Sequence, residues 1–255
     1  MTLTVAGEPL IAYLLASVRI ISWLAVVPPF ASRSVPAPAK VVLSLGLAFT
    51  VVPAVPDARV PTGSVELITN VLVQVGLGLA MGFVTMLLFT AVAAAGSLID
   101  LFGGFALAQG FDPLGMNLNS VFGKFHSLLA SVLLFATGAH LLVIGGMLQT
   151  FDLVPIGTTP SVPNAPDVLM KAFDVFFVTA VQIALPMAAV LFIADLGLAL
   201  LTKVAPQLNA INVMFPAKIG LTLLLLGLSF PVLPVAVRRL ADLANQAMAG
   251  LAGGG

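Results

Sequence analysis

The 255-residue sequence has no cysteine, few charged residues and only two histidines. The absence of cysteine excludes disulfides and thiolate metal sites. His126 and His140 are too few to form a metal site without carboxylates, and they do not show a ligand spacing such as HxxxH. The formal net charge is zero, and no run of basic residues suggests a nucleic-acid partner. We therefore expect no metal, no cofactor and no nucleic acid.

The low charge content also excludes an ordinary soluble domain. Charged residues make up 8% of the chain and hydrophobic residues 60%, whereas soluble domains carry about 25% charged residues. The composition predicts an all-α, polytopic integral membrane protein. The first basic residue, Arg19, lies inside the first apolar run rather than before it, so we expect no cleavable secretory signal.

Six apolar runs follow one another with no soluble domain between them. They span residues 9–31, 41–56, 67–99, 127–151, 175–194 and 219–237. Prolines at 28 and 29 should end the first run, and Pro186, Pro231 and Pro234 should kink the last two. The third run is longer than one span needs, so it must tilt, kink or continue past the bilayer.

Within the third run, Gly78 and Gly82 have the small-xxx-small spacing that allows two helices to approach closely. Glycine is also common in membrane helices without such a role, so both interpretations stay open.

Residues 195–218 separate the last two runs and combine prolines with amides in an apolar setting. Pro206 and Pro216 interrupt helical hydrogen bonding, and Gln207 and Asn209 add polar side chains. Non-helical backbone at membrane depth is tolerated only when it is buried in protein or lines a watery cavity. We expect an irregular segment that contacts a partner or lines a channel. The alternative is a turn on the membrane surface.

Arg19 and Asp195 are the only charges well inside apolar runs. Each costs about 2.5–3.5 kcal/mol at a helix centre on insertion scales, and mutual pairing would lower this cost. Alternatively, each faces a polar interior or reaches the interface separately. A secondary transporter of a small solute would use both as coupling or substrate residues, although the sequence lacks two related halves with matching broken helices.

An enzyme would need clustered titratable groups at a cleft. The candidates are scattered along the chain: Asp100, Asp112, His126 and His140. We therefore expect no catalytic residues.

Three segments together carry a resemblance to a known family. The first, R-x8-P-x-F followed by P-x-P-x-K, contains Arg19, Pro28, Phe30, Pro36, Pro38 and Lys40. The second, AG-x-x-I-D-x-x-GG-x-x-x-A-x-x-x-DP, contains Ala95, Gly96, Ile99, Asp100, Gly103, Gly104, Ala108, Asp112 and Pro113. The third, D-x-x-L-x-x-x-x-K/R-x-x-PQLN-x-x-x-x-x-FP-x-K, contains Asp195, Leu198, Lys203, Pro206, Gln207, Leu208, Asn209, Phe215, Pro216 and Lys218. The chain resembles the FliR family of type III protein export systems, whose injectisome members are called SctT.

The resemblance implies an export-gate subunit of the bacterial inner membrane, at the base of a flagellum or injectisome. FliR-like proteins assemble with FliP-like and FliQ-like subunits, and with an FlhB-like subunit, around a pore for unfolded proteins. It also implies a FliP-like part over residues 1–174, followed by a FliQ-like hairpin and tail over residues 175–255. The third segment supplies the expected assembly motif: Asp195, Lys203, Pro206, Gln207, Asn209, Pro216 and Lys218.

Residues 103–119 are candidates for a plug that seals the resting pore. Phe105, Phe111 and Met116 are bulky and apolar, and four glycines in the stretch supply backbone freedom. An apolar constriction holds back ions by dewetting, and the resemblance implies a plug loop in this region. The alternative is an ordinary turn whose aromatic side chains pack on neighbouring helices.

Overall fold

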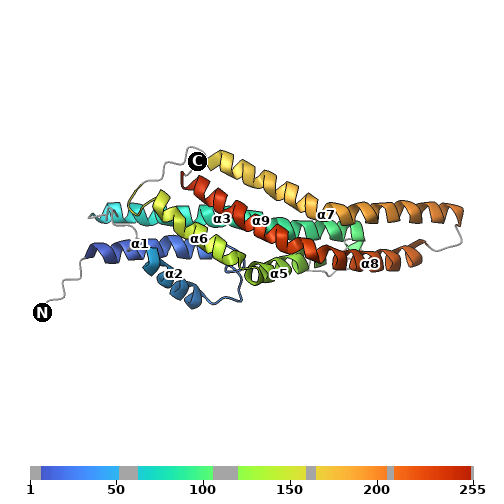
Figure 1. Ribbon diagram of the computed structural model, residues 1–255, viewed down its shortest axis with the longest axis horizontal. Helices are drawn as coiled ribbons and strands as arrows, with labels where there is room; N and C mark the ends of the chain where they lie inside the picture. The colour runs from blue at the N-terminus through green and yellow to red at the C-terminus, as the bar shows by residue number, and fades with distance from the viewer. Residues whose placement is uncertain (1–6, 52–62, 106–119, 159–164, 206–209, 254–255) are drawn as a thin grey trace. The chain divides into compact units, whose positions relative to one another are not determined.

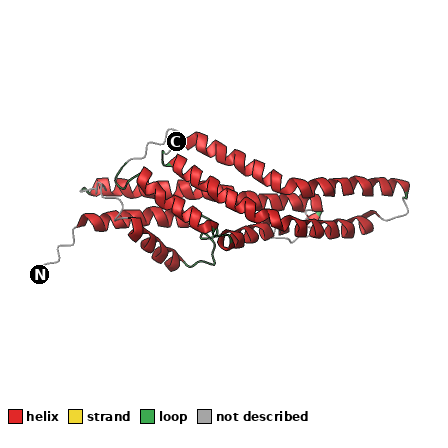
Figure 2. Ribbon diagram, viewed as in Figure 1, coloured by secondary structure: helices red, strands yellow, loops and turns green. Residues whose placement is uncertain are grey.

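The computed structural model describes residues 7–51, 63–105, 120–158, 165–205 and 210–253. Throughout these residues every regular element is a helix, as Figure 2 shows, so the all-α expectation is confirmed. The helices, labelled in Figure 1, are α1 (Gly7–Leu24), α2 (Ala37–Val51), α3 (Ser64–Gly103), α5 (Val121–Ala136), α6 (Ala139–Leu153), α7 (Ala165–Val204), α8 (Ala210–Ser229), the 3-10 turn η2 (Phe230–Val232) and α9 (Leu233–Leu251).

Three helical stretches in the described residues are long and apolar enough to cross a membrane: Ser64–Gly103, Ala165–Val204 and Pro216–Leu251. The pair α5 and α6 would add a fourth if it forms one broken span. The shorter apolar helices are Pro9–Leu24 and α2. The chain is therefore a polytopic membrane protein, as its composition predicts.

Two helix boundaries differ from the predicted runs because of prolines. α1 ends at Leu24 instead of continuing to residue 31. The ring of Pro28 would clash with the carbonyl of the residue four positions earlier, which is Leu24. The helix α7 begins at Ala165, ahead of the predicted run at 175–194, with Pro166 and Asp167 in its first turn. Both residue types suit a helix start, where proline loses no bond and an acidic side chain meets the helix dipole.

The apolar run at 127–151 forms two helices instead of one. It is broken between α5 and α6, which are bent by 77°. Thr137 follows α5 and its hydroxyl donates to the carbonyl of Leu133 at 2.7 Å. Gly138 then adopts a φ of 71°, which favours glycine. A mid-run glycine in this conformation turns the chain before α6 begins.

The expectation of irregular backbone at residues 195–218 is wrong for 195–204 and 210–218, which are helical, and stays a prediction for 206–209, which lie outside the described residues. α7 continues to Val204, and α8 already begins at Ala210. Pro216 lies inside α8. Helix is favoured here because it satisfies nearly all backbone groups within an apolar setting, and a single proline removes only one hydrogen bond. Near Pro231, where a kink is expected, the 3-10 turn η2 separates α8 from α9, and the kink itself stays a prediction.

The chain divides into two compact units. Unit 1 consists of residues 1–88, 138–173 and 239–255, and unit 2 of residues 89–137 and 174–238. The division predicted at residues 174/175, into a FliP-like and a FliQ-like part, stays a prediction.

In unit 1, α1 packs closely against the first part of α3. A Cβ on Gly78 would lie 2.3 Å from the carbonyl oxygen of Arg19, and one on Gly82 would lie 3.0 Å from Cβ of Val26. The close-approach interpretation of these two glycines is therefore confirmed. Tyr13 of α1 also donates from its hydroxyl to the carbonyl of Leu45 in α2, at 3.0 Å. The largest buried side chains of the unit include Trp23, Met81, Met147 and Phe151.

In unit 2, four helices contribute to one apolar core. Its buried members are Ala95, Ile99, Phe122, Ala184, Met187 and Leu226. Here too a glycine allows a close crossing, because a Cβ on Gly96 of α3 would lie 2.3 Å from the carbonyl oxygen of Phe122 in α5.

Candidate functional sites among the buried polar residues

Arg19 is fully buried in unit 1 and binds the end of α6. Its Nη2 donates to the carbonyl of Val154 at 2.9 Å, and its Nη1 to that of Thr150 at 3.4 Å. Its Nε donates to Oε1 of Gln74 in α3 at 2.6 Å, and the guanidinium carbon lies 4.1 Å from the ring centroid of Phe151. The last carbonyls of a helix lack intrahelical donors and carry partial negative charge. The planar guanidinium therefore finds several acceptors and an aromatic face at one helix end.

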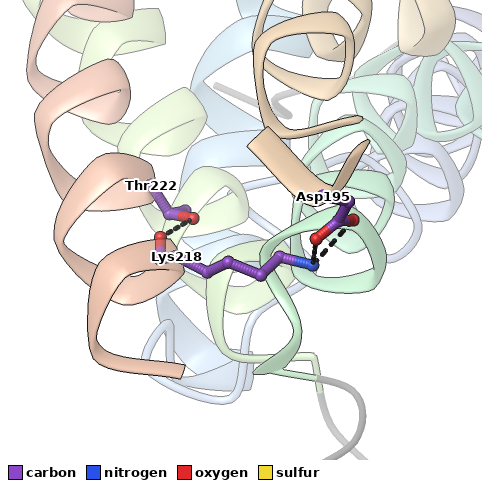
Figure 3. Close-up of polar contacts among 3 residues, drawn as sticks. All are labelled: Asp195, Lys218 and Thr222. Atoms are coloured by element: carbon purple, nitrogen blue, oxygen red, sulfur yellow. Dashed lines mark hydrogen bonds and ion pairs between the residues drawn. The ribbon is translucent and has the colours of Figure 1, made fainter. Parts of the chain in front are cut away.

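Asp195 and Lys218 form an ion pair between α7 and α8 in unit 2 (Figure 3). Nζ of Lys218 lies 2.7 Å from Oδ1 and 2.9 Å from Oδ2 of Asp195. The Lys218 side chain is only 9% exposed, whereas that of Asp195 is 35% exposed. One turn further along α8, the Thr222 hydroxyl donates to the carbonyl of Lys218 at 2.7 Å. An ammonium in this apolar setting needs the carboxylate because it has little access to water.

The ion pair also sets the register of the two helices. Asp195 lies nine residues before the end of α7 at Val204, and Lys218 eight residues after the start of α8 at Ala210. At about 1.5 Å per residue, both charges lie about 12–14 Å from these helix ends. The pair therefore joins α7 and α8 at similar distances from the end of α7 and the start of α8.

Each of the two intramembrane charges identified from the sequence thus has its own partner. Arg19 binds Gln74 and the α6 carbonyls, while Asp195 binds Lys218. The predicted mutual pairing is therefore wrong, and the alternative of separate polar surroundings describes the structure. Both charges are therefore already engaged within the chain, which removes the main support for a small-solute transporter.

A third polar cluster joins α3 to the start of α5. Asp100 is 2% exposed, and its Oδ2 accepts hydrogen bonds from the Ser120 hydroxyl and, at 3.0 Å, from the backbone N–H of Phe122. The Ser120 hydroxyl also accepts from the N–H of Gly123 at 2.7 Å, which makes Ser120 the N-cap of α5. His126 lies one turn into α5, with Nδ1 2.8 Å from the carbonyl oxygen of Phe122.

The structure places the other predicted site residues as follows. Lys203 is exposed in the last turn of α7, and Pro216 is exposed within α8. Phe105 is partly buried, with its ring edge-to-face on Phe122 at a centroid distance of 4.9 Å. The remaining residues lie outside the described part of the chain, so their roles stay predictions: Phe111, Met116, Pro206, Gln207 and Asn209.

The partners of the buried charges were not predicted from the sequence. Gln74 is one of two amides in the run at 67–99, so a polar partner for a neighbouring helix was detectable there. Ser120, followed by the apolar start of α5, has the residue type that N-caps prefer. The α6 carbonyls that bind Arg19 leave no such signal, because every residue has a carbonyl.

Apolar helices joined by buried polar side chains define the chain as an integral membrane protein with specific internal packing. Residues 10–244 match the family of bacterial export proteins, family 1, and the chain belongs to this family. It is 31% identical over 217 residues to the flagellar biosynthetic protein FliR of Pectobacterium carotovorum, covering 85% of this chain and 83% of that protein. It is 30% identical over 215 residues to FliR of Escherichia coli, covering 84% and 82%.

A relative with a different name is also similar. The Yop proteins translocation protein T of Yersinia pestis is 28% identical over 228 residues, covering 86% of this chain and 85% of that protein. These matches confirm the resemblance to the FliR and SctT family over most of the chain.

Proposed function

We propose that this chain is the FliR-like export-gate subunit of a type III secretion system that builds flagella. It assembles with FliP-like, FliQ-like and FlhB-like subunits in the bacterial inner membrane, where it helps to form the pore for unfolded proteins. The observation that carries the proposal is the family match over residues 10–244, together with similarity to flagellar and Yop export proteins. In this role the chain is a part of an export apparatus and not an enzyme.

The exposed apolar surface supports a protein that is completed by lipid and partner subunits. In an apolar 18-residue stretch of Ala165–Val204, only 28% is buried within the chain. The corresponding share for an 18-residue stretch of Pro216–Leu251 is 17%. Large side chains on these helices are exposed, among them Phe177, Phe192, Leu200 and Leu228. Such surface needs an apolar environment.

Gene deletion in the native bacterium tests the function. Loss of the chain should stop secretion of flagellar filament protein while its synthesis continues, and re-expression should restore secretion. Continued secretion of filament protein, with loss of secreted effector proteins instead, would place the chain in an injectisome. Normal secretion of both classes would contradict an export role.

The predicted plug is the second part of the proposal. A pore wide enough for an unfolded chain must hold back ions when idle, and Phe105, Phe111 and Met116 supply the bulky apolar side chains for this. Replacing all three with Ser should make membranes leak small solutes while the assembly persists. Replacing them with Leu, which is also bulky and apolar, should preserve the barrier. An intact barrier in the assembled Ser variant would contradict the plug.

A further inference from the structure

A polar pocket of about 350 Å³ lies between α6 and α9 in unit 1. It begins where the two helices approach most closely, because a Cβ on Gly146 of α6 would lie 2.2 Å from Oδ1 of Asn245 in α9. The rest of its wall follows this contact along each helix and consists of Gln149, Thr150, Asp152 and Leu153 of α6 and Ala249 of α9. We call this space the α6–α9 pocket.

Two oxygen acceptors of the α6–α9 pocket have no donor among the described residues. The Asp152 carboxylate belongs to an exposed residue and forms no ion pair with any of them. Oδ1 of Asn245 is enclosed, yet it accepts no hydrogen bond from them, and a buried acceptor without a donor carries its full desolvation cost. No hydrogen bond holds this oxygen in place, and the last torsion of asparagine is broad, so the amide can turn its oxygen into the pocket.

The charges around the α6–α9 pocket leave room for one more cation. Arg19 approaches the same end of α6, but its donors are already taken by two backbone carbonyls and by Gln74. Arg239 and Asp242 lie three residues apart on the exposed face of α9, so their charges offset each other. Asp152 is left without an opposite charge, and it lies in the last turn of α6, where the helix carbonyls add partial negative charge.

The pocket's surroundings suit a basic side chain of another protein better than a metal ion. Within the described ranges, no group of three or more His, Cys, Asp or Glu could hold a metal. An arginine or lysine needs only a carboxylate and an amide oxygen for its charged end, and an apolar surface for its stem. Leu153 supplies that surface, because it lines the pocket and is 45% exposed. Arginines that fill pockets are among the commonest anchors of protein interfaces.

We propose that the α6–α9 pocket receives an arginine or lysine side chain from a neighbouring subunit of the export assembly. Its charged end donates to the Asp152 carboxylate and to Oδ1 of Asn245, and its stem packs on Leu153. The contact holds the end of α6 and the last turns of α9 to that subunit. This inference rests on the proposed function, because it requires an assembled state.

Photo-crosslinking from the pocket wall tests the proposal in native membranes. Photoreactive p-benzoylphenylalanine in place of Leu153 puts the reactive group beside Asp152. We expect a covalent product with another subunit of the purified assembly, and mass spectrometry should place the attachment next to an arginine or lysine of that subunit. A product with lipid alone, or with a protein stretch that carries no basic residue, would overturn the proposal.

Neutralising the carboxylate separates a specific contact from mere proximity. Asp152→Asn should lower the yield of the crosslinked product about tenfold, because the basic group loses a charge-assisted hydrogen bond. Asp152→Glu keeps the charge and should retain most of the product. Asp167→Asn, at an exposed position of α7, is the matched control and should leave the yield unchanged. Loss of the Asp152→Asn chain from the membrane would make Asp152 a structural residue and would overturn the proposal.

A charge exchange completes the test. Asp152→Arg should weaken retention of the neighbouring subunit, and an acidic replacement of the crosslinked basic residue should restore it. If the exchange gives no recovery, or if Asp152→Asn and Asp167→Asn give equal yields in assemblies that still contain the FliP-like subunit, the pocket proposal is overturned while the export function stands. A wild-type chain that copurifies with no such subunit would instead contradict the proposed function, and the pocket proposal would fall with it.

Discussion

At the scale of single residues, the buried charges are held by groups that composition does not reveal. Arg19 is satisfied by two backbone carbonyls, one amide and one aromatic ring. A buried charge without such partners would cost several kcal/mol. The arginine therefore links three helices, α1, α3 and α6, through a single side chain.

Arg19→Met should destabilise unit 1. The change leaves Oε1 of Gln74 and the carbonyl of Val154 without the donor they now have, at about 1–3 kcal/mol for each unsatisfied group, partly offset by removal of the buried charge. Adding Gln74→Leu should recover part of the loss, because it removes one unsatisfied group. The melting temperature of the purified assembly measures both effects. Arg33→Met, at an exposed position, serves as the control, and equal melting temperatures for the two Met variants would contradict this account of Arg19.

Gly78→Ala should force α1 away from α3. The new Cβ would lie 2.3 Å from the backbone carbonyl oxygen of Arg19, so the backbone itself must shift, at about 1–3 kcal/mol. Gly76→Ala is a matched control on the same helix, because a Cβ there meets nothing within 4 Å. That control should be neutral or stabilising by up to about 1 kcal/mol, since alanine is the better helix former. Thermal denaturation compares the two variants, and a Gly78→Ala protein as stable as Gly76→Ala would contradict the packing.

At the scale of elements, the sequence predicted where most helices lie. It did not predict the break between α5 and α6 or the helix around Pro216. Apolar runs identify helices because an apolar setting requires internal backbone hydrogen bonding. Gly138 was not predicted to divide a run, because the sequence does not indicate which of several glycines adopts a positive φ. Pro216 was assigned to an irregular segment, because the sequence does not show that the surrounding helix tolerates one lost bond.

The ion pair between α7 and α8 predicts unequal effects of its two single mutants. Asp195→Asn leaves the 9% exposed Lys218 side chain without its counter-charge, whereas Lys218→Met leaves a carboxylate that is 35% exposed and can reach water. The first change should therefore cost about 1–3 kcal/mol, between the values for buried and surface pairs, and the second less.

Exchanging the two residues, Asp195→Lys with Lys218→Asp, should recover part of the stability. The yield and melting temperature of the purified assembly measure all three variants, with Lys171→Met at an exposed position of α7 as the control. Equal losses in the two single mutants, without recovery in the exchange, would show that the pair does not stabilise the helices.

At the scale of the whole molecule, the chain's apolar surface and its family point to an assembled state. The resemblance was detectable from the sequence because the PQLN stretch and its flanking residues are specific. The role of that stretch could not be predicted from the sequence, because side-chain contacts to other subunits leave no pattern in one chain. Gln207 and Asn209 therefore remain assembly residues by prediction only.

Leucine at position 207 or 209 should disturb assembly more than membrane insertion. The amides can supply hydrogen bonds across a subunit interface, whereas leucine keeps the segment apolar enough to insert. Membrane fractionation and co-purification of partner subunits separate the two effects. Normal assembly with lost export would instead make the stretch a surface that contacts the exported protein.

The most direct test of the export-gate assignment is the mass of the particle that contains this chain. Affinity purification from native membranes in a mild detergent, followed by mass measurement and identification of the components, should give a particle far heavier than the 26.2 kDa chain. It should contain FliP-like and FliQ-like subunits. A monomeric chain, under conditions that keep other membrane assemblies of the same cells intact, would contradict the account.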